Sequence, residues 1–122
     1  MAQAFQDLTV WQRAMEMTVS IYELTRGFPK DEQYGLTSQL RRAAVSVASN
    51  IAEGRGRHTH GEFRHFLSIA QGSTYEVHTQ LLVARRLRIG DDAASQKAEV
   101  LCIEVSKMLG AFIKSLTLEA RS

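Results

Sequence analysis

The chain of 122 residues holds a single cysteine, Cys102, and a single proline, Pro29. One thiol excludes a disulfide within the chain and a zinc site built from several cysteines. No leader with a charged start and an apolar centre opens the sequence, so we expect a protein of the reducing cytoplasm. No apolar run approaches the roughly 20 residues that cross a bilayer, so we expect no membrane partner.

An excess of charge of one sign is also nearly missing. Lysine and arginine together number 15, and aspartate and glutamate number 13, which leaves a net charge of +2. So small a balance does not by itself indicate a nucleic-acid-binding protein. With 44% apolar and 23% charged residues, the composition is that of an ordinary globular protein. At roughly 100 to 200 residues per domain, we expect one domain over residues 1–122.

The spacing of apolar residues predicts helices rather than strands. Glycines and the one proline interrupt the chain too rarely for a fold of short strands. Between these breaks, apolar residues recur every three or four positions, as on one face of a helix. The predicted helices span residues 9–26, 34–53, 60–89 and 92–118. Short connections make each helix antiparallel to the next, so the predicted fold class is all-α, an antiparallel up-down-up-down four-helix bundle.

Specific residues are expected to begin and end these helices. Thr9 and Thr59 each have Gln or Glu three positions later, which is the spacing of a capping box. Gly90 is expected to end the third helix, and Asp92 to cap the fourth. The expected buried face is Trp11, Ala14, Met15, Thr18, Tyr22 and Thr25 in the first helix, and Leu36, Leu40, Ala43, Ala44, Val47 and Ile51 in the second.

The second predicted helix carries more apolar residues than one buried face needs. Seven of the ten residues from 43 to 52 are Ala, Val or Ile. Val45, Ala48 and Ala52 share a line that lies about 120° around the helix from the main apolar face. We predict that these three residues contact a neighbouring copy in a homo-oligomer, because soluble monomers rarely expose large apolar patches. The alternative is that small residues there only favour helix formation.

The basic residues are concentrated in the middle of the chain. Residues 41–88 contain eight arginines against three glutamates, a local balance of +5. The planar guanidinium group matches phosphate oxygens two at a time. We therefore predict that clustered arginines contact RNA or DNA phosphates, namely Arg41, Arg42, Arg55, Arg57, Arg64, Arg85, Arg86 and Arg88. Alternatively, the arginines pair with acidic groups on a protein partner, which would make the chain a scaffold.

The segment from Glu53 to His60 is a candidate phosphate site. Gly54 and Gly56 would let the backbone bend toward a ligand at the start of the third helix, where unpaired amides favour anions. The alternative is that the glycines only terminate a helix.

Residues that support catalysis are sparse. No nucleophile elbow, dinucleotide fingerprint or kinase motif is present, so we expect a non-enzymatic protein with no cofactor and no metal. A weaker alternative is a small enzyme or metal-binding bundle that uses His58, His60 and Glu62, with His65 nearby. The histidines lack the i, i+4 spacing of known helical zinc motifs.

Three segments of the chain resemble a known family. They are FQDLTVWQRAMEMTVSIY (5–22), YGLTSQLRRAAVSVASNIAEGRGR (34–57) and EFRHFLSIAQGSTYE (62–76), and they resemble the four-helix bundle proteins encoded in 23S rRNA intervening sequences. The most specific part is 39–57, where the Arg41-Arg42 pair, Asn50 and the pattern Ala-Glu-Gly-x-Gly-Arg follow one another in order.

That family is in turn similar to the accessory variability proteins of diversity-generating retroelements. The resemblance implies a ring-like homo-oligomer, a pentamer, with a role in nucleic-acid or ribonucleoprotein binding. It points to Arg41, Arg42, Arg55 and Arg57 as basic contacts, and to Asn50, Glu53, Gly72 and Glu76 as structural members of the motif. It leaves open an accessory role beside a polymerase or reverse transcriptase.

Overall fold

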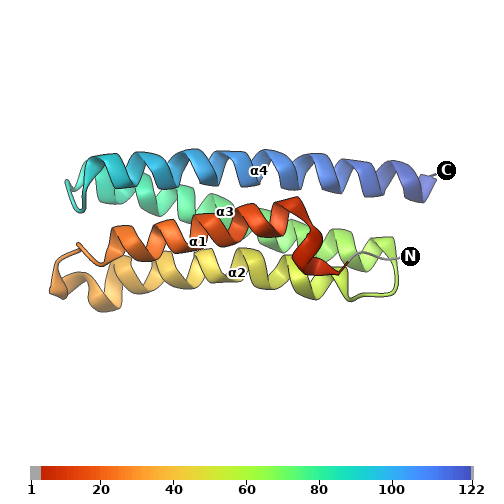
Figure 1. Ribbon diagram of the computed structural model, residues 1–122, viewed down its shortest axis with the longest axis horizontal. Coiled ribbons are helices and arrows are strands. Elements are labelled where there is room, and N and C mark those ends of the chain that lie inside the picture. Colours follow the sequence, from red (N-terminus) through yellow and green to blue (C-terminus); the bar gives the residue numbers. More distant parts are fainter. Residues whose placement is uncertain (1–3, 122) are drawn as a thin grey trace.

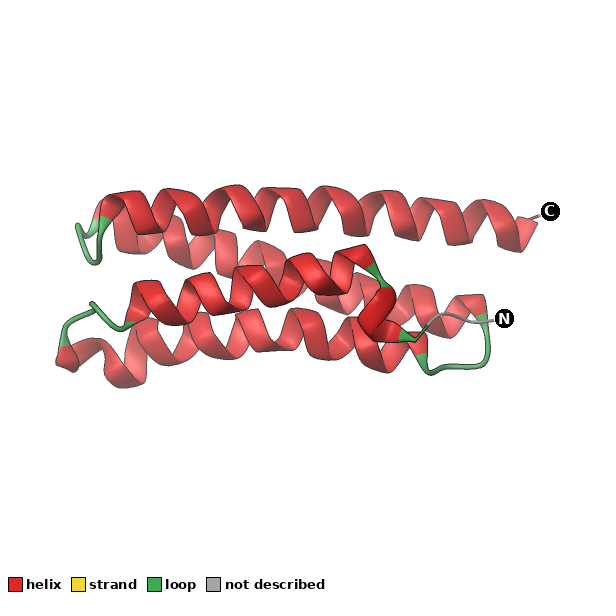
Figure 2. Ribbon diagram, in the orientation of Figure 1, coloured by secondary structure: helices red, strands yellow, loops and turns green. Residues whose placement is uncertain are grey.

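The computed structural model describes residues 4–121, and every regular element in that range is a helix or a helical turn. The long helices are α1 (Thr9–Thr25), α2 (Ser38–Arg55), α3 (His60–Arg86) and α4 (Asp92–Arg121). Short turns add η1 (Phe5–Asp7) before α1, and η2 (Lys30–Glu32) and η3 (Gln33–Thr37) before α2. Figure 2 shows helices and loops only, so the all-α fold class is confirmed for the described part of the chain.

The four helices lie along one long axis (Figure 1). Successive helices are joined at alternating ends: α2 starts at the left-hand end, where α1 finishes, and α3 starts at the right-hand end. α1 packs on α2, α2 on α3, and α3 on α4, and the bundle closes because α4 also packs on α1. Within residues 4–121, no helix combines the length and the apolar character needed to cross a membrane.

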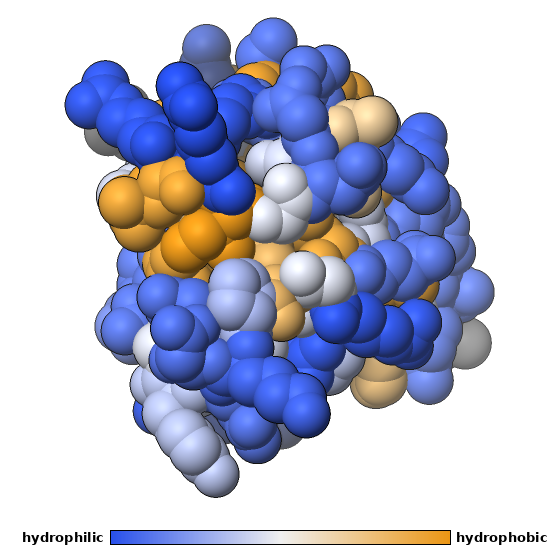
Figure 3. Space-filling model, turned by 90° about the vertical axis from the view of Figure 1, so that its left-hand side faces the viewer, coloured by the Kyte–Doolittle hydropathy of each residue, from blue (hydrophilic) through white to orange (hydrophobic). Residues whose placement is uncertain are grey.

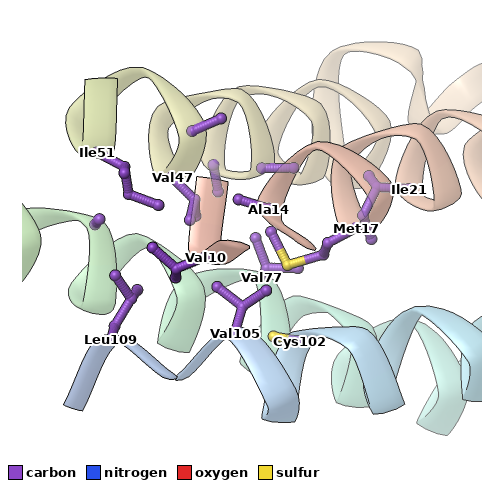
Figure 4. Packing of buried hydrophobic residues seen from close by; sticks show 14 of the residues in the cluster. Val10, Ala14, Met17, Ile21, Val47, Ile51, Val77, Cys102, Val105 and Leu109 are labelled. Carbon is purple, nitrogen blue, oxygen red and sulfur yellow. The ribbon is translucent and has the colours of Figure 1, made fainter. Parts of the chain in front are cut away.

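The core runs down the centre of the bundle and receives side chains from all four helices (Figure 4). Its largest fully buried side chains are Met17, Ile21, Leu40, Val47, Ile51, Leu67, Val77, Leu81, Val105 and Leu109. On α2, the predicted stripe is confirmed, since five of its six residues are buried and Leu36 packs against the same cluster. The helices therefore meet through one apolar face each, as their spacing predicts.

The predicted buried face of α1 is confirmed only in part: Ala14 and Thr25 are buried and Trp11 packs against the core, while Thr18 and Tyr22 are half-buried. Met15 is 40% exposed, whereas the side chains that enter the core are Val10, Ala14, Met17, Ile21 and Leu24. This second series has the same three- and four-residue spacing and is more apolar than the predicted one. Because α1 is apolar over much of its circumference, periodicity alone does not select the face that packs.

Thr59 is confirmed as the residue that caps α3, while the predicted capping box at the start of α1 is wrong. The Glu62 amide donates to Thr59 Oγ1 at 3.1 Å, so the Thr59 hydroxyl satisfies one of the unpaired amides of α3. Thr9 instead lies inside α1, where Leu8 takes the cap position with no side-chain hydrogen bond.

The third helix ends three residues earlier than predicted, at Arg86 rather than 89. Arg88 adopts a left-handed conformation with φ 57°, and the Ile89 amide donates to the Ala84 carbonyl at 2.9 Å. This is a Schellman ending, in which the left-handed position is more often glycine. Gly90 has φ 88°, and a side chain there would also collide with Phe28, so glycine is required four residues after the helix end, in the turn to α4.

The fourth helix is capped by Asp91, one residue before the predicted cap. The Ala94 amide donates to Asp91 Oδ2 at 2.9 Å, while Asp92 Oδ2 accepts from the side chain of Gln96. At its other end α4 continues to Arg121, past the predicted end at 118.

The second helix begins at Ser38, four residues later than predicted. The preceding segment η3 is a π-helical turn with a kink at Gly35, where φ is −108° and ψ is −114°. The Glu32 carboxylate caps this turn by accepting from the Leu36 amide at 3.1 Å. The kink leaves Tyr34 89% exposed at the edge of α2.

Gly54 sets how closely α2 approaches α3. A Cβ atom at this position would lie 2.7 Å from Phe66 Cβ, a distance that real structures essentially never show, and at a tight 3.0 Å from Phe63 Cδ1. At Gly56 an added Cβ would meet only ordinary contacts, the nearest at 3.5 Å. Neither glycine has a positive φ, so neither needs the conformational freedom of glycine here, and the predicted bend of the backbone toward a ligand stays a prediction. Gly54 instead permits close packing of two helices.

We expect Gly54→Ala to lower the free energy of unfolding. The clash with Phe66 and Phe63 should cost about 1–3 kcal/mol, which outweighs the gain of about 1 kcal/mol in helix propensity. Gly56→Ala is the matched control, and its stability should stay close to that of the parent or rise. Urea denaturation followed by circular dichroism measures both, and equal stabilities for the two variants would contradict the packing role of Gly54.

Candidate nucleic-acid interface

The eight predicted arginines fall into two groups at opposite ends of the bundle. Arg42 and Arg55 are 13 positions apart on α2, which is about 20 Å at 1.5 Å per residue. The end where α2 starts carries Arg41, Arg42, Arg85, Arg86 and Arg88, and the end where α3 starts carries Arg55, Arg57 and Arg64. Within one chain the eight arginines therefore do not form a single cluster, and whether self-association brings the two groups together stays a prediction. We call the second group, with residues 54–66, the α2–α3 tip.

Arg41 is used inside the fold. Its Nε donates to Thr25 Oγ1 at 2.8 Å, and its guanidinium group lies 4.5 Å above the centre of the Tyr22 ring. Both partners lie in the last turn of α1, so Arg41 fastens α2 to α1 near the C-terminal end of that helix. Its predicted role as a phosphate contact is not supported by this geometry.

Arg85 is also engaged by carboxylates of its own chain. Its Nη1 donates to Glu99 Oε1 at 2.9 Å, and its Nε lies 3.6 Å from Asp92 Oδ1. His78 Nε2 lies 2.9 Å from the other oxygen of Glu99. These contacts with His78 and then Arg85 lower the pKa of Glu99 from its usual value. The charge of Arg85 is therefore balanced inside the α3–α4 contact.

The other arginines at this end point to solvent. The side chains of Arg42, Arg86 and Arg88 are exposed and form no ion pair with the described residues. Acidic residues at the same end include Asp91 and Asp92, which offset their charge. Figure 3 looks onto this end and shows a hydrophobic area among hydrophilic side chains. The end is thus mixed in character rather than uniformly basic.

At the α2–α3 tip, two arginines lie on aromatic rings. The Arg57 guanidinium group is 4.6 Å from the centre of the Phe66 ring, and Arg55 is 5.8 Å from that of Phe63. Arg57 also pairs with Glu53 at 2.8 Å, in an exposed i, i+4 contact that contributes little. The rings belong to α3 and the arginines to the end of α2 and the turn that follows it, so helix packing holds both cations in place.

The tip retains hydrogen-bond donors with no partner. Arg55 Nε is buried and has no hydrogen-bond acceptor among the described residues. Arg64, half-buried one turn into α3, forms no ion pair in residues 4–121. The first amides of α3 open at the same tip, where the helix dipole favours anions. The arrangement suits an oxyanion such as phosphate.

The histidines of the tip do not converge. His60 Nε2 lies 3.7 Å from Glu119, and the His65 ring meets the edge of Phe66 with 5.5 Å between ring centres. Across the described residues, no group of three or more His, Cys, Asp and Glu side chains could hold a metal ion. The alternative metal site of His58, His60 and Glu62, with His65 nearby, therefore gains no support.

The one cysteine is placed as a buried apolar residue. Cys102 Sγ donates to the Thr74 carbonyl at 3.2 Å, and burial raises the pKa of its thiol to about 12. Nucleophilic chemistry needs a thiolate, so this environment does not favour catalysis by Cys102.

The predicted oligomer stripe is partly covered by the chain itself. Ala48 is only 6% exposed and belongs to the core, because α2 turns that side toward its neighbours, so its predicted contact with another copy is wrong. Val45 is 42% exposed and Ala52 is half-buried, so both stay predictions.

A larger apolar surface, missed in the sequence, lies between α1 and α4. Met15, Val19, Val100 and Leu101 line an open groove of about 630 Å³, which we call the α1–α4 groove. Glu16, Glu23 and Lys97 also line it. Val19 and Val100 lie outside the helix faces that periodicity assigns to the core. Apolar residues outside those faces are the sequence signal that could have revealed this apolar surface.

The fold and the basic tip define a four-helix protein with a candidate oxyanion site. The chain belongs to the 23S rRNA-intervening sequence protein family, whose model matches residues 6–111. A protein of unknown function from the S23 ribosomal protein family of Bacteroides thetaiotaomicron has a similar crystal structure, with a TM-score of 0.75 and 23% sequence identity. The match covers 87% of this chain and 99% of that one. No curated protein matches.

The Glu99 contacts predict a pH-dependent contribution to stability. Because folding lowers the pKa of Glu99, its contribution is present above the usual glutamate pKa of about 4.3 and is lost as the pH falls through the lower value in the fold. Glu99→Gln should therefore be less stable than the parent at neutral pH, and the difference should shrink in acid. Urea titrations across that pH range measure it.

Asp31→Asn serves as the control, since Asp31 is exposed and has no partner among the described residues. A Glu99→Gln variant that matches the parent at neutral pH would show that the cluster contributes no stability.

Proposed function

We propose that this chain is a non-enzymatic, oligomeric protein that binds RNA or DNA phosphates through its α2–α3 tip. The observation that carries the proposal is the placement of Arg55 and Arg57 on the rings of Phe63 and Phe66, with Arg55 Nε buried and lacking an acceptor. A guanidinium group fixed in this way loses less side-chain entropy when it binds an anion.

The salt dependence of binding tests the tip. Each phosphate contact releases counterions, so log affinity should fall by roughly 0.7 to 0.9 per contact for each tenfold rise in salt. Arg55→Ala with Arg57→Ala should weaken binding to a mixed RNA and DNA pool and flatten this slope by about two contacts. Arg86→Ala, an exposed arginine at the other end, is the matched control. Fluorescence anisotropy at several salt concentrations gives the slopes.

If the tip variant keeps the parent's slope while Arg86→Ala loses part of it, the site lies at the opposite end of the bundle. A parent protein that binds neither nucleic acid at low salt would overturn the proposal.

Self-association is the second part of the proposal. A cyclic ring larger than a dimer needs two different surfaces that fit each other. The α1–α4 groove is one apolar surface, and the exposed side of α3, with Tyr75, Leu82 and Val83, is a second. We assign a second copy of this chain to the groove. This agrees with the ring-like pentamer that the resemblance to accessory variability proteins implies.

Charge placed in the groove should disrupt the oligomer. Val19→Glu adds a carboxylate beside Glu16 and Glu23, so we expect its native mass to fall to that of the monomer. Val45→Glu makes the same change on α2 at similar exposure and should leave the mass unchanged. Light scattering after size exclusion measures both. If Val45→Glu becomes monomeric and Val19→Glu keeps the parent's mass, the interface is the α2 stripe predicted from the sequence and not the groove.

Mixing two variants tests whether the contact joins different surfaces. Val19→Glu has a disrupted groove and an intact α3 surface, and Leu82→Glu has an intact groove and a disrupted α3 surface. If the two surfaces contact each other, equal amounts of these variants should form a one-to-one dimer, in which the groove of Leu82→Glu binds the α3 surface of Val19→Glu. A parent that is monomeric at micromolar concentration would overturn self-association and leave the groove to a protein partner, such as a nucleic-acid enzyme.

A further inference from the structure

A second groove, different in character, lies between α2 and α3. Tyr34, Arg42, Ser46, Glu76 and Gln80 are among the residues that line it, and we call it the Tyr34 groove. Its volume of about 520 Å³ lies in the range of roughly 300–1,000 Å³ usual for small-ligand sites. It is separate from the α2–α3 tip, toward the other end of α2.

Short side chains allow this groove to form. Ala43, Ser46 and Ser73 line it, and the hydroxyl oxygens of Ser46 and Ser73 lie 2.9 Å apart, which joins α2 to α3. Asn50 Nδ2 donates to the Ser46 carbonyl at 2.8 Å and supports the same contact. One hydroxyl donates to the other, and Asn50 Nδ2 also donates to Ser46 Oγ at 3.0 Å, so these contacts hold this part of the groove in place.

Tyr34 supplies an exposed aromatic ring at the groove. A tyrosine usually buries most of its ring, yet this one is 89% exposed and makes no ring contact within residues 4–121. The Glu32 cap and the kink at Gly35 fix the backbone that carries it. A ring presented in this way offers a flat surface on which another ring can stack.

The polar groups of the groove have few partners. Arg42 and Glu76 both line it, yet they form no ion pair with each other or with other described residues. Gln80 Oε1 is buried without a hydrogen-bond donor, while its Nε2 makes only a long contact of 3.5 Å to Gln39 Oε1. The groove therefore contains one cation, Arg42, and two hydrogen-bond acceptors, Glu76 and Gln80 Oε1, for which no ion pair or hydrogen-bond donor is found among the described residues.

We propose that the Tyr34 groove binds one unpaired nucleotide of a single-stranded nucleic acid. The base stacks on the Tyr34 ring, its phosphate accepts from the Arg42 guanidinium group, and N–H groups on the base edge donate to Glu76 or Gln80. Bases within a duplex are stacked and paired, so only a single strand can supply this ligand. The inference rests on the proposed function and extends it, since it adds a site that selects single strands.

The test uses the full chain and two forms of one probe. The first is a single-stranded 12-nucleotide RNA with a central 2-aminopurine, whose fluorescence falls when the base stacks, and the second is the same strand paired with its complement. Tyr34→Ala should weaken single-strand binding about tenfold and abolish the quenching. Tyr34→Phe, which keeps the ring, should retain both. Duplex affinity should be equal in all three proteins.

Arg42→Ala tests the phosphate contact. It should reduce the salt slope for the single strand by about 0.7, the value for one contact, and leave the duplex slope unchanged. Arg86→Ala, which removes an equally unpaired arginine outside the groove, should change neither slope.

Three results would overturn the proposal that the Tyr34 groove binds a nucleotide. If Tyr34→Ala binds and quenches the single strand as the parent does while the Arg55→Ala, Arg57→Ala variant loses binding, the tip remains the site and the groove is not one. If Tyr34→Ala changes native mass but not affinity, the groove is a contact between subunits. If the parent binds no probe at low salt, both the groove and the proposed function fail. A thermal melt of each variant confirms that it is folded.

Discussion

The contact between α2 and α3 positions both candidate nucleic-acid surfaces. At one end, the missing side chain of Gly54 lets α2 lie against Phe63 and Phe66, and the same two rings hold Arg55 and Arg57. Further along, Ser46 and Ser73 keep the helices close enough to share a hydroxyl contact at the Tyr34 groove. A bulky residue at either point would separate the helices and displace the arginines or fill the groove.

The count of arginines is a poor guide to the charge that a partner can reach. Arg41 stabilises the end of α1, and Arg85 is balanced by Glu99 and Asp92. These residues lie 14 or more positions from their main partners, except for the Asp92 contact across the α3–α4 turn. Helix packing decides which arginines form contacts within the chain. A local charge balance of +5 therefore does not show how many arginines a partner can reach.

Periodicity predicted the fold class, the four helices and the buried face of α2, because that face is the main regular apolar series on the helix. It was only partly right on α1, where Met15 and Met17 belong to two series of equal spacing and only Met17 is buried. Helix ends depended on single backbone details, such as the kink at Gly35 and the left-handed Arg88. Apolar residues left over from the core faces, such as Val19 and Val100, signal an uncovered apolar surface. The shape of the two grooves could not be predicted, since each is made by side chains of two helices whose relative placement no spacing encodes.

The order of packing around the bundle separates the two grooves. Because α1 lies on α2, α2 on α3, α3 on α4 and α4 on α1, the α1–α4 and α2–α3 sides face away from each other. A copy docked in the apolar α1–α4 groove would therefore cover the side remote from Tyr34. The next copy in the ring would dock at the α3 surface, whose Tyr75 shares a pocket with Glu76 and Gln80 of the Tyr34 groove. Assembly through the α1–α4 groove would also repeat the tip once per subunit. Several weak phosphate contacts would then act on one strand together, and such a particle could bind tightly although each chain carries a net charge of only +2.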